Sequence, residues 1–351
     1  MLPLKNARRR FASRTSFRRR ASMLAALFAV CTLPALAVSA ISTRGAQTAE
    51  AARSRITIAL GVRVRVAPQV SAEEVGRLQL GTVIRELERT ASRERIGASE
   101  DYWYRVAAPG VAEGWVFGGL IAAFDPNRRA EIYQRIAAER LKVEGASFAD
   151  QIDLVRFLDR AVPEVSQVNA AAELELLRLL ALRRSLASVA FEKQAEPPYD
   201  AWLKEQQPRI VYSEPAGQWH VLSELFWNLR TKYRALPVAE RIAWEAAQNP
   251  LPGECEGFLP CYFGYYNLTH IEYLRLYPRG AHADESLADF GKFLDGVFED
   301  FKGQKSYDVP RADRAEFKKT LAKTRLVISK VPGPRRTTIL RQLDELARRF
   351  R

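Results

Sequence analysis

Two kinds of hydrophobic spacing divide this chain near residue 125. Between residues 56 and 124, valine, leucine and aromatic residues alternate with polar ones in short runs that glycine and proline interrupt. Alternation with a period of two is typical of strands that bury one face. From residue 128 onward, apolar residues recur three and four positions apart among alanine, glutamate and arginine, as in amphipathic helices. The pattern predicts an α+β multidomain protein, with a small β-domain at 56–124 and an all-helical region at 125–351.

The strands of the β-domain are short and closely spaced, as in a compact barrel. The clearest runs are Val62–Arg65, Val75–Leu78, Tyr102–Val106 and Gly114–Val116. Because side chains on a strand alternate between its faces, we expect one set of valines to point inward and form the core. That set is Val62, Val64, Val83, Val106 and Val116.

The order of these runs resembles the bacterial SH3-like domain, in which similar Val-Arg, Gly-Pro and Gly-Trp-Val anchors follow one another. The resemblance implies an SH3-like β-barrel, with cell-wall peptide or a partner protein as its ligand. Two features depart from the family pattern. Arg63 stands where the family usually has asparagine, and the connection between Arg85 and Asp101 is unusually long and charged.

Aromatic residues supply the candidate ligand contacts of the β-domain. Trp103 lies between Tyr102 and Tyr104, so the two tyrosines share the face opposite the tryptophan. We expect Trp103 to be half-buried and Trp115 to fill the core. Because SH3-like barrels often hold peptide or glycan on exposed aromatic rings, the resemblance makes these four residues the candidate ligand-binding set.

Helical spacing predicts segments at about 128–142, 148–160, 169–193, 311–329 and 337–350. The third is apolar on nearly all sides, which indicates a central helix packed against several others. Its glutamates and arginines exclude a membrane span. Glu173 and Glu175 on this helix are expected to form ion pairs rather than to carry acid–base chemistry.

An internal repeat with an offset of 44 residues lies in the second half of the chain. Lys232 and Tyr233 precede Ala239, as Leu276 and Tyr277 precede Ala283. A helix that ends in an aromatic residue, a turn with proline and a second helix make a helical hairpin. The segment 277–285 resembles the turn of tetratricopeptide-like repeats, which implies stacked hairpins near 219–300.

The first forty residues have the features of an export signal. A basic segment precedes an apolar core at 23–37, and the small residues Val38–Ala40 follow it. We therefore expect a signal peptide at 1–40, a linker at 41–55 and a periplasmic or extracellular protein. Contact with a membrane is expected only through an uncleaved N-terminal segment. The formal charge is +13, but eight basic residues and no acid lie within the first forty, so nucleic acid is not an expected partner.

Cys255 and Cys261 flank a turn rich in glycine and proline, and in an exported chain this pair indicates a disulfide. A second interpretation stays open. The segment 254–259 resembles the Asp-Cys-Ser-Gly-Phe-Val segment of cell-wall peptidases that use a catalytic cysteine, which would make Cys255 a nucleophile. Such an enzyme needs a histidine base. The chain has only His220, His270 and His282, and no glycine-rich strands follow Cys261.

The cysteines and histidines do not have the spacing of a compact zinc site, so neither a metal nor another cofactor is expected. The sequence as a whole predicts an exported, non-enzymatic envelope protein. Its SH3-like domain and helical scaffold would bind peptidoglycan peptide or envelope proteins. The alternative is a cell-wall cysteine peptidase that uses Cys255.

Overall fold

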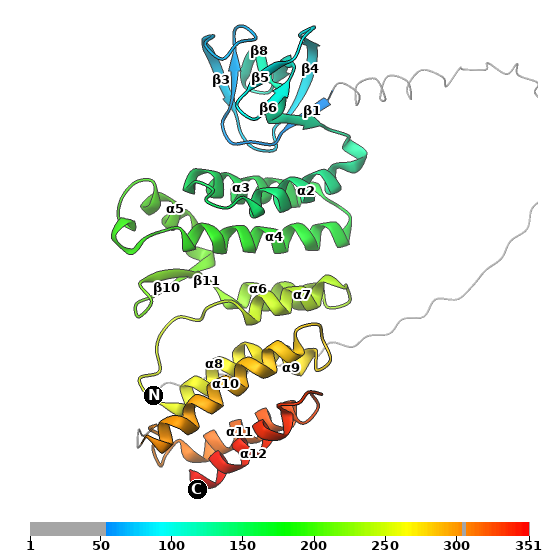
Figure 1. Cartoon of the computed structure of the whole chain (residues 1–351). Coiled ribbons are helices and arrows are strands. Elements are labelled where there is room, and N and C mark those ends of the chain that lie inside the picture. The colour runs from blue at the N-terminus through cyan, green and yellow to red at the C-terminus, as the bar shows by residue number, and fades with distance from the viewer. Residues whose placement is uncertain (1–53, 304–306, 351) are drawn as a thin grey trace, which may run out of the picture. The chain divides into compact units, whose positions relative to one another are not determined.

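Seven of the nine strands between Ser54 and Ala123 form one curled antiparallel sheet (Figure 1). The computed structural model describes residues 54–303 and 307–350. In spatial order, the seven strands of this sheet are β3 (Glu74–Leu78), β2 (Val62–Arg65), β8 (Val111–Phe117), β7 (Trp103–Ala108), β4 (Val83–Arg89), β1 (Ser54–Thr57) and β9 (Ile121–Ala123). The predicted signal peptide at 1–40 lies outside the described residues. The predicted linker ends earlier than expected, because its residues 54 and 55 belong to β1.

The core of the β-domain contains four of the five predicted valines. Val62, Val64, Val106 and Val116 are each at most 1% exposed. The prediction for Val83 is wrong, because Val83 packs against the helical region. Val83 pairs with Ile56 in the sheet, and both side chains lie on the side that the helices cover. The next residue along β4, Ile84, points into the barrel instead.

The long charged connection after β4 contains a two-stranded hairpin that sequence reasoning did not predict. Its strands are β5 (Glu94–Ile96) and β6 (Ser99–Asp101). A carboxylate of this hairpin accepts a hydrogen bond from the indole of β7, because Trp103 Nε1 lies 2.6 Å from Glu94 Oε2. The hairpin is therefore tied to the sheet by a charge-assisted hydrogen bond.

The rest of the described chain is helical apart from one small hairpin, so the protein is α+β as predicted (Figure 1). The helices are α2 (Arg129–Lys142), α3 (Phe148–Ala161), α4 (Val168–Ala187), α5 (Tyr199–Gln206), α6 (Ser223–Lys232), α7 (Val238–Ala247), α8 (Leu259–Leu268), α9 (His270–Leu276), α10 (Ala283–Lys302), α11 (Arg314–Ile328) and α12 (Arg336–Arg349). The hairpin consists of β10 (Ile210–Ser213) and β11 (Gln218–Val221). Among the described residues, no helix combines the length and apolarity that crossing a bilayer requires.

Helix α4 is the central helix that the sequence predicts. It packs against α2, α3, α6, α7 and β11, and its buried side chains lie on several faces. Ion pairs join its acidic residues to the next layer, from Glu175 to Lys232 at 2.7 Å and from Glu173 to Arg241. These contacts agree with the predicted structural role of the two glutamates.

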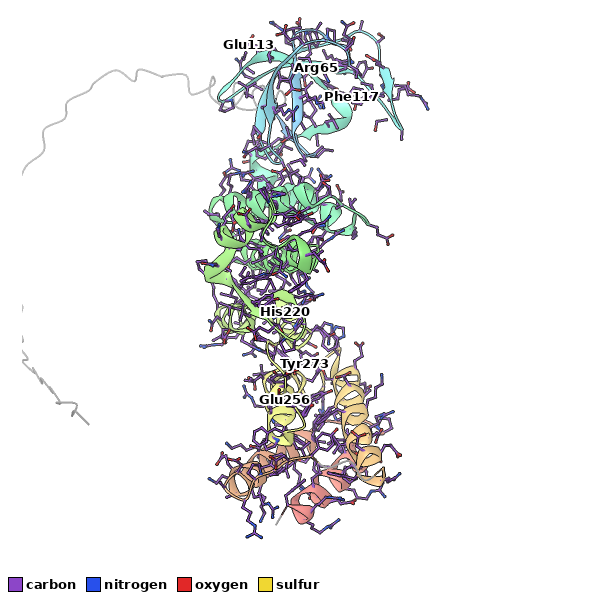
Figure 2. The ribbon with its side chains drawn as sticks, turned by 90° about the vertical axis from the view of Figure 1, so that its left-hand side faces the viewer. Arg65, Glu113, Phe117, His220, Glu256 and Tyr273 are labelled. Carbon is purple, nitrogen blue, oxygen red and sulfur yellow. A yellow bond between two sulfur atoms is a disulfide. The ribbon has the colours of Figure 1, made fainter. Side chains whose placement is uncertain are left out.

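The two segments related by the 44-residue offset both form a helix, a tyrosine, a turn and a second helix. The first consists of α6 and α7 and the second of α9 and α10, and each pair packs together. Glu240 of α7 links them, because its carboxylate accepts hydrogen bonds from Tyr273 Oη, at 2.9 Å, and from the N–H of Ala281. Tyr273 is fully buried at this junction (Figure 2).

The turn between β3 and β4 contacts helix α3. Leu80 is fully buried, its N–H donates to Asp153 Oδ2 at 3.2 Å, and its carbonyl accepts from Arg160 Nη2 at 3.0 Å. Gly81 has φ of +79°, and a Cβ at this position would lie 2.2 Å from Phe157. Both the backbone conformation and the space therefore require glycine. Burial raises the pKa of Asp153, and the hydrogen bond from Leu80 opposes that shift.

Candidate functional site

A cavity of about 260 Å³ opens on the β-domain. Strand β2 contributes Arg63 and Arg65 to its lining, and the β5–β6 hairpin contributes Ile96 and Ser99. Trp103 and Phe117 also line the cavity. Arg65 and Phe117 both lie in the barrel (Figure 2). The hairpin in the unusually long connection thus supplies one side of the site.

The aromatic part of the lining is rigid. Trp103 and Phe117 are paired residues on β7 and β8, and they are 3% and 6% exposed. Their ring centroids are 5.7 Å apart in an edge-to-face arrangement. Since Glu94 holds the indole N–H, the tryptophan cannot turn without breaking that hydrogen bond. The cavity therefore offers a preformed apolar surface.

The two arginines of the cavity have different surroundings. The side chain of Arg63 is 55% exposed and lies 3.5 Å from Glu74. Arg65 is only 9% exposed, and its Nη1 donates to the carbonyl of Ala72 at 2.6 Å. Within residues 54–303 and 307–350, no carboxylate lies within 4 Å of the Arg65 nitrogens. A hydrogen bond from Arg77 lowers the pKa of Glu74, and the charges of Arg77, Arg63 and Arg65 add to that shift.

Of the four predicted ligand residues, only Trp103 lines this cavity. Tyr104 is 5% exposed and belongs to the barrel core, so it offers no exposed face. Tyr102 is half-buried, with the guanidinium of Arg89 4.5 Å from its ring centroid. The prediction that Trp115 fills the core is wrong, because Trp115 is half-buried while Trp103 is nearly inaccessible. The β5–β6 hairpin covers Trp103, and the sequence pattern of β7 and β8 contained no sign of that cover.

Arg65 was not among the predicted site residues. Both Arg63 and Arg65 line the cavity, but the pairing of β2 with β3 shifts register between Val64 and Arg65, so strand alternation alone could not place Arg65. Burial of one arginine and exposure of the other depend on the loop between β2 and β3, which contributes the Ala72 carbonyl. The alternation of residues along a strand does not show which of two arginines a neighbouring loop will bury.

The cysteine pair lies far along the chain from the cavity. Cys255 and Cys261 are joined by a disulfide, and Cys255 is 6% exposed. The turn between them, which contains Glu256 (Figure 2), is paired with the segment after α10. Asp308 donates its N–H to the carbonyl of Gly257, and its own carbonyl accepts from Leu259. A bonded sulfur is not a thiolate, so this state of the protein has no cysteine nucleophile at 255.

The structure brings a serine, a histidine and an aspartate together at the second helical hairpin. His270 Nδ1 lies 3.3 Å from Ser286 Oγ, and His270 Nε2 lies 3.6 Å from Asp289 Oδ2. Ser286 is fully buried, so its hydroxyl cannot reach a substrate. Burial lowers the pKa of His270, and the charge of Asp289 opposes that shift.

The other two histidines lie at the start of α10 and on β11. His282 stacks on Trp244 with ring centroids 4.2 Å apart. His220 lies on β11 (Figure 2), and burial lowers its pKa. The described part of the chain has no cluster of three or more histidine, cysteine or acidic side chains suited to a metal ion.

Comparison with known proteins adds one match. Residues 60–122 match the family model of the bacterial SH3 domain. The match extends from β2 into β9 and contains every residue that lines the cavity. Neither the curated proteins nor the solved structures include one that matches the chain.

Proposed function

We propose that this protein is an exported, non-enzymatic protein of the bacterial cell envelope that binds peptidoglycan peptide through its β-domain. The observation that carries the proposal is the cavity, because it lies wholly within the residues that match the bacterial SH3 domain. Domains of that family often bind the cell wall. An apolar, preformed hollow with a few polar groups at its edge is the usual form of a specific binding site.

The helical region is proposed to act as a scaffold for envelope proteins. Its two hairpins, α6–α7 and α9–α10, have the helix–tyrosine–turn–helix order for which tetratricopeptide-like stacking was predicted. Hydrogen bonds of Glu240 to Tyr273 and to the backbone of Ala281 join one hairpin to the next, as a scaffold requires. In this proposal the β-domain contacts the wall and the hairpins offer surface to protein partners.

Two features support an oxidising compartment outside the cytoplasm. The first is the predicted signal peptide at 1–40, and the second is the disulfide between Cys255 and Cys261. Disulfides are rare in cytosolic proteins because thiol reductants keep cysteines reduced there. We propose the periplasm or the extracellular space as the location.

Catalysis by Cys255 is not part of the proposal. The sulfur is bonded to Cys261 and nearly inaccessible. A cysteine peptidase would also need a histidine within hydrogen-bond reach of the thiol. His270 and His282 instead contact Asp289 and Trp244.

Sedimentation with purified peptidoglycan sacculi tests the proposed function. Val70 at the mouth of the cavity is 50% exposed, and Val143 in the helical region is 43% exposed. Because Val70→Glu places a charge in the mouth, we expect this variant to lose binding. Val143→Glu carries the same change at similar exposure outside the cavity and should bind as the unaltered chain does. The proposal fails if the unaltered chain stays in the supernatant, or if both variants sediment equally well.

A further inference from the structure

We infer that the β-domain cavity recognises the free carboxylate at the end of a peptide, and that Arg65 is the residue that binds it. This inference rests on the proposed function for the peptide nature of the ligand. It goes further than the proposed function, because it names the chemical group that is recognised and the side chain that binds this group. The first observation is the burial of a guanidinium that, among the described residues, has no carboxylate within 4 Å.

Arg65 is more than nine-tenths buried, and its one hydrogen bond goes to the Ala72 carbonyl. Arginine has five N–H donors, and a charge removed from water is unfavourable unless it gains an anion or enough acceptors. None of the Arg65 nitrogens is a fully buried atom without a partner, so its remaining donors still meet solvent. Since Arg65 lines the cavity, the cavity is where those donors are open to a ligand.

The charges around the cavity favour an anion. Both charged residues of the lining, Arg63 and Arg65, are cations. The carboxylate of Glu74 lies near them, but Arg77 already holds it with two hydrogen bonds, the shorter of 2.5 Å. The positive charge of these three arginines therefore exceeds the negative charge of the one carboxylate near them. A carboxylate is the planar anion that a guanidinium binds with two parallel hydrogen bonds.

The size and the apolar part of the lining indicate what stands beside the carboxylate. A volume of about 260 Å³ falls just below the range of roughly 300 to 1,000 Å³ for sites that enclose a drug-sized ligand. The cavity therefore suits the last one or two residues of a peptide. The Trp103 and Phe117 rings favour small apolar side chains there. A carboxylate next to an alanine methyl group, the chemistry of a wall stem peptide that ends in D-alanine, meets both requirements.

The first test uses the unaltered protein and two forms of one probe. Diacetyl-L-lysyl-D-alanyl-D-alanine is titrated as the free acid and as the C-terminal amide, with binding measured by calorimetry. The amide cannot make the charge-assisted hydrogen bonds of the acid, so the acid should bind at least about tenfold more tightly. The preference should shrink as salt is added, because ions screen the charge of the partly open site. Equal affinity for the acid and the amide overturns the inference.

The second test compares Arg65→Gln with Arg85→Gln. Each variant loses one positive charge, but Arg85 is exposed on β4 and is not part of the cavity lining. We expect Arg65→Gln to remove the preference for the acid over the amide and Arg85→Gln to keep it. An equal reduction of the acid preference in both variants would mean that the preference depends on net charge and not on Arg65. If a thermal melt shows that Arg65→Gln is unfolded, Arg65→Lys takes its place, and the two-probe titration of the unaltered protein still decides.

Sacculi with amidated carboxylates separate this inference from the proposed function. Loss of binding after amidation supports the inference. If the protein sediments equally with native and amidated sacculi, carboxylate recognition is overturned while wall binding stands. If it prefers the free-acid peptide but does not bind sacculi, carboxylate recognition stands and the peptide has another source than the wall.

Discussion

At the scale of single residues, Arg63 and Arg65 show how much surroundings change the role of one side-chain type. They stand two positions apart on β2, and the first is exposed and paired with Glu74. The second is buried with a single backbone carbonyl as its partner. An exposed ion pair such as Arg63–Glu74 contributes little to stability, because water screens the two charges. A buried arginine without a carboxylate beside it, such as Arg65, tends to lower stability, and its presence is more easily explained by a role in binding.

The two tryptophans of the β-domain also differ in burial, so removing each of them should lower stability by a different amount. Trp103 is 3% exposed, and deleting so large a buried side chain costs about 3 to 5 kcal/mol. Trp115 is half-buried, so Trp115→Ala should cost about 1 kcal/mol, which is typical of point mutations. Urea denaturation of Trp103→Ala and Trp115→Ala measures both. A larger loss for Trp115→Ala would contradict the positions described above.

At the scale of elements, the disulfide is one of two restraints on the same turn. The other is the pairing of Asp308 with Gly257 and Leu259. Together they fix the start of α8 against the segment that follows α10. The turn therefore has a structural role that does not depend on reactive sulfur.

Replacing the cysteines tests that role. The bond closes a loop with a sequence separation of 6, so losing it should cost about 2 kcal/mol in the chain-entropy model. We expect Cys255→Ser and Cys261→Ser to lower the melting temperature equally. The double variant should cost little more than either, because both changes open one loop. A loss of wall digestion that is confined to Cys255→Ser would instead indicate a catalytic cysteine.

The sequence predicted an element well where the hydrophobic pattern within that element was sufficient to define it. The helices at 129–142 and 148–161 begin and end within a residue or two of prediction, because their apolar spacing is a local signal. The β5–β6 hairpin was missed, because residues 85–101 are charged and their strands are held by tertiary contacts such as that of Glu94. Trp103 was included in the site for its chemistry, whereas Arg65 was missed because its burial depends on a loop.

At the scale of the whole molecule, the β-domain and the helical region share part of one core. Ile56, Leu80 and Phe124 belong to the sheet or its edges, but they are buried in the cluster that the helices form. Each such side chain contributes about 1.5 to 3 kcal/mol when fully buried. The β-domain therefore depends on the helical region for part of its stability.

Leu80→Ala provides a test of that dependence. In the full chain the change should cost about 2 to 5 kcal/mol, because it leaves a cavity against α3. In isolated residues 54–124, Leu80 has no helix to contact, so the same change should have little effect. The isolated domain should also be less stable than the domain in the full chain. Denaturation of the four proteins, followed by tryptophan fluorescence, gives the comparison, and equal effects of Leu80→Ala in both settings would refute shared stabilisation.

The contact at Leu80 and Gly81 limits how this domain can be exchanged in evolution or in engineering. A barrel transplanted from another protein would need a leucine followed by a glycine at this turn. Without the glycine, a side chain would collide with Phe157, and without the leucine, the core formed with the helices would lose a fully buried side chain. A β-domain that is exchanged between proteins therefore needs a matching α3 surface in its new context. The segment that can be exchanged as one piece is larger than the β-domain.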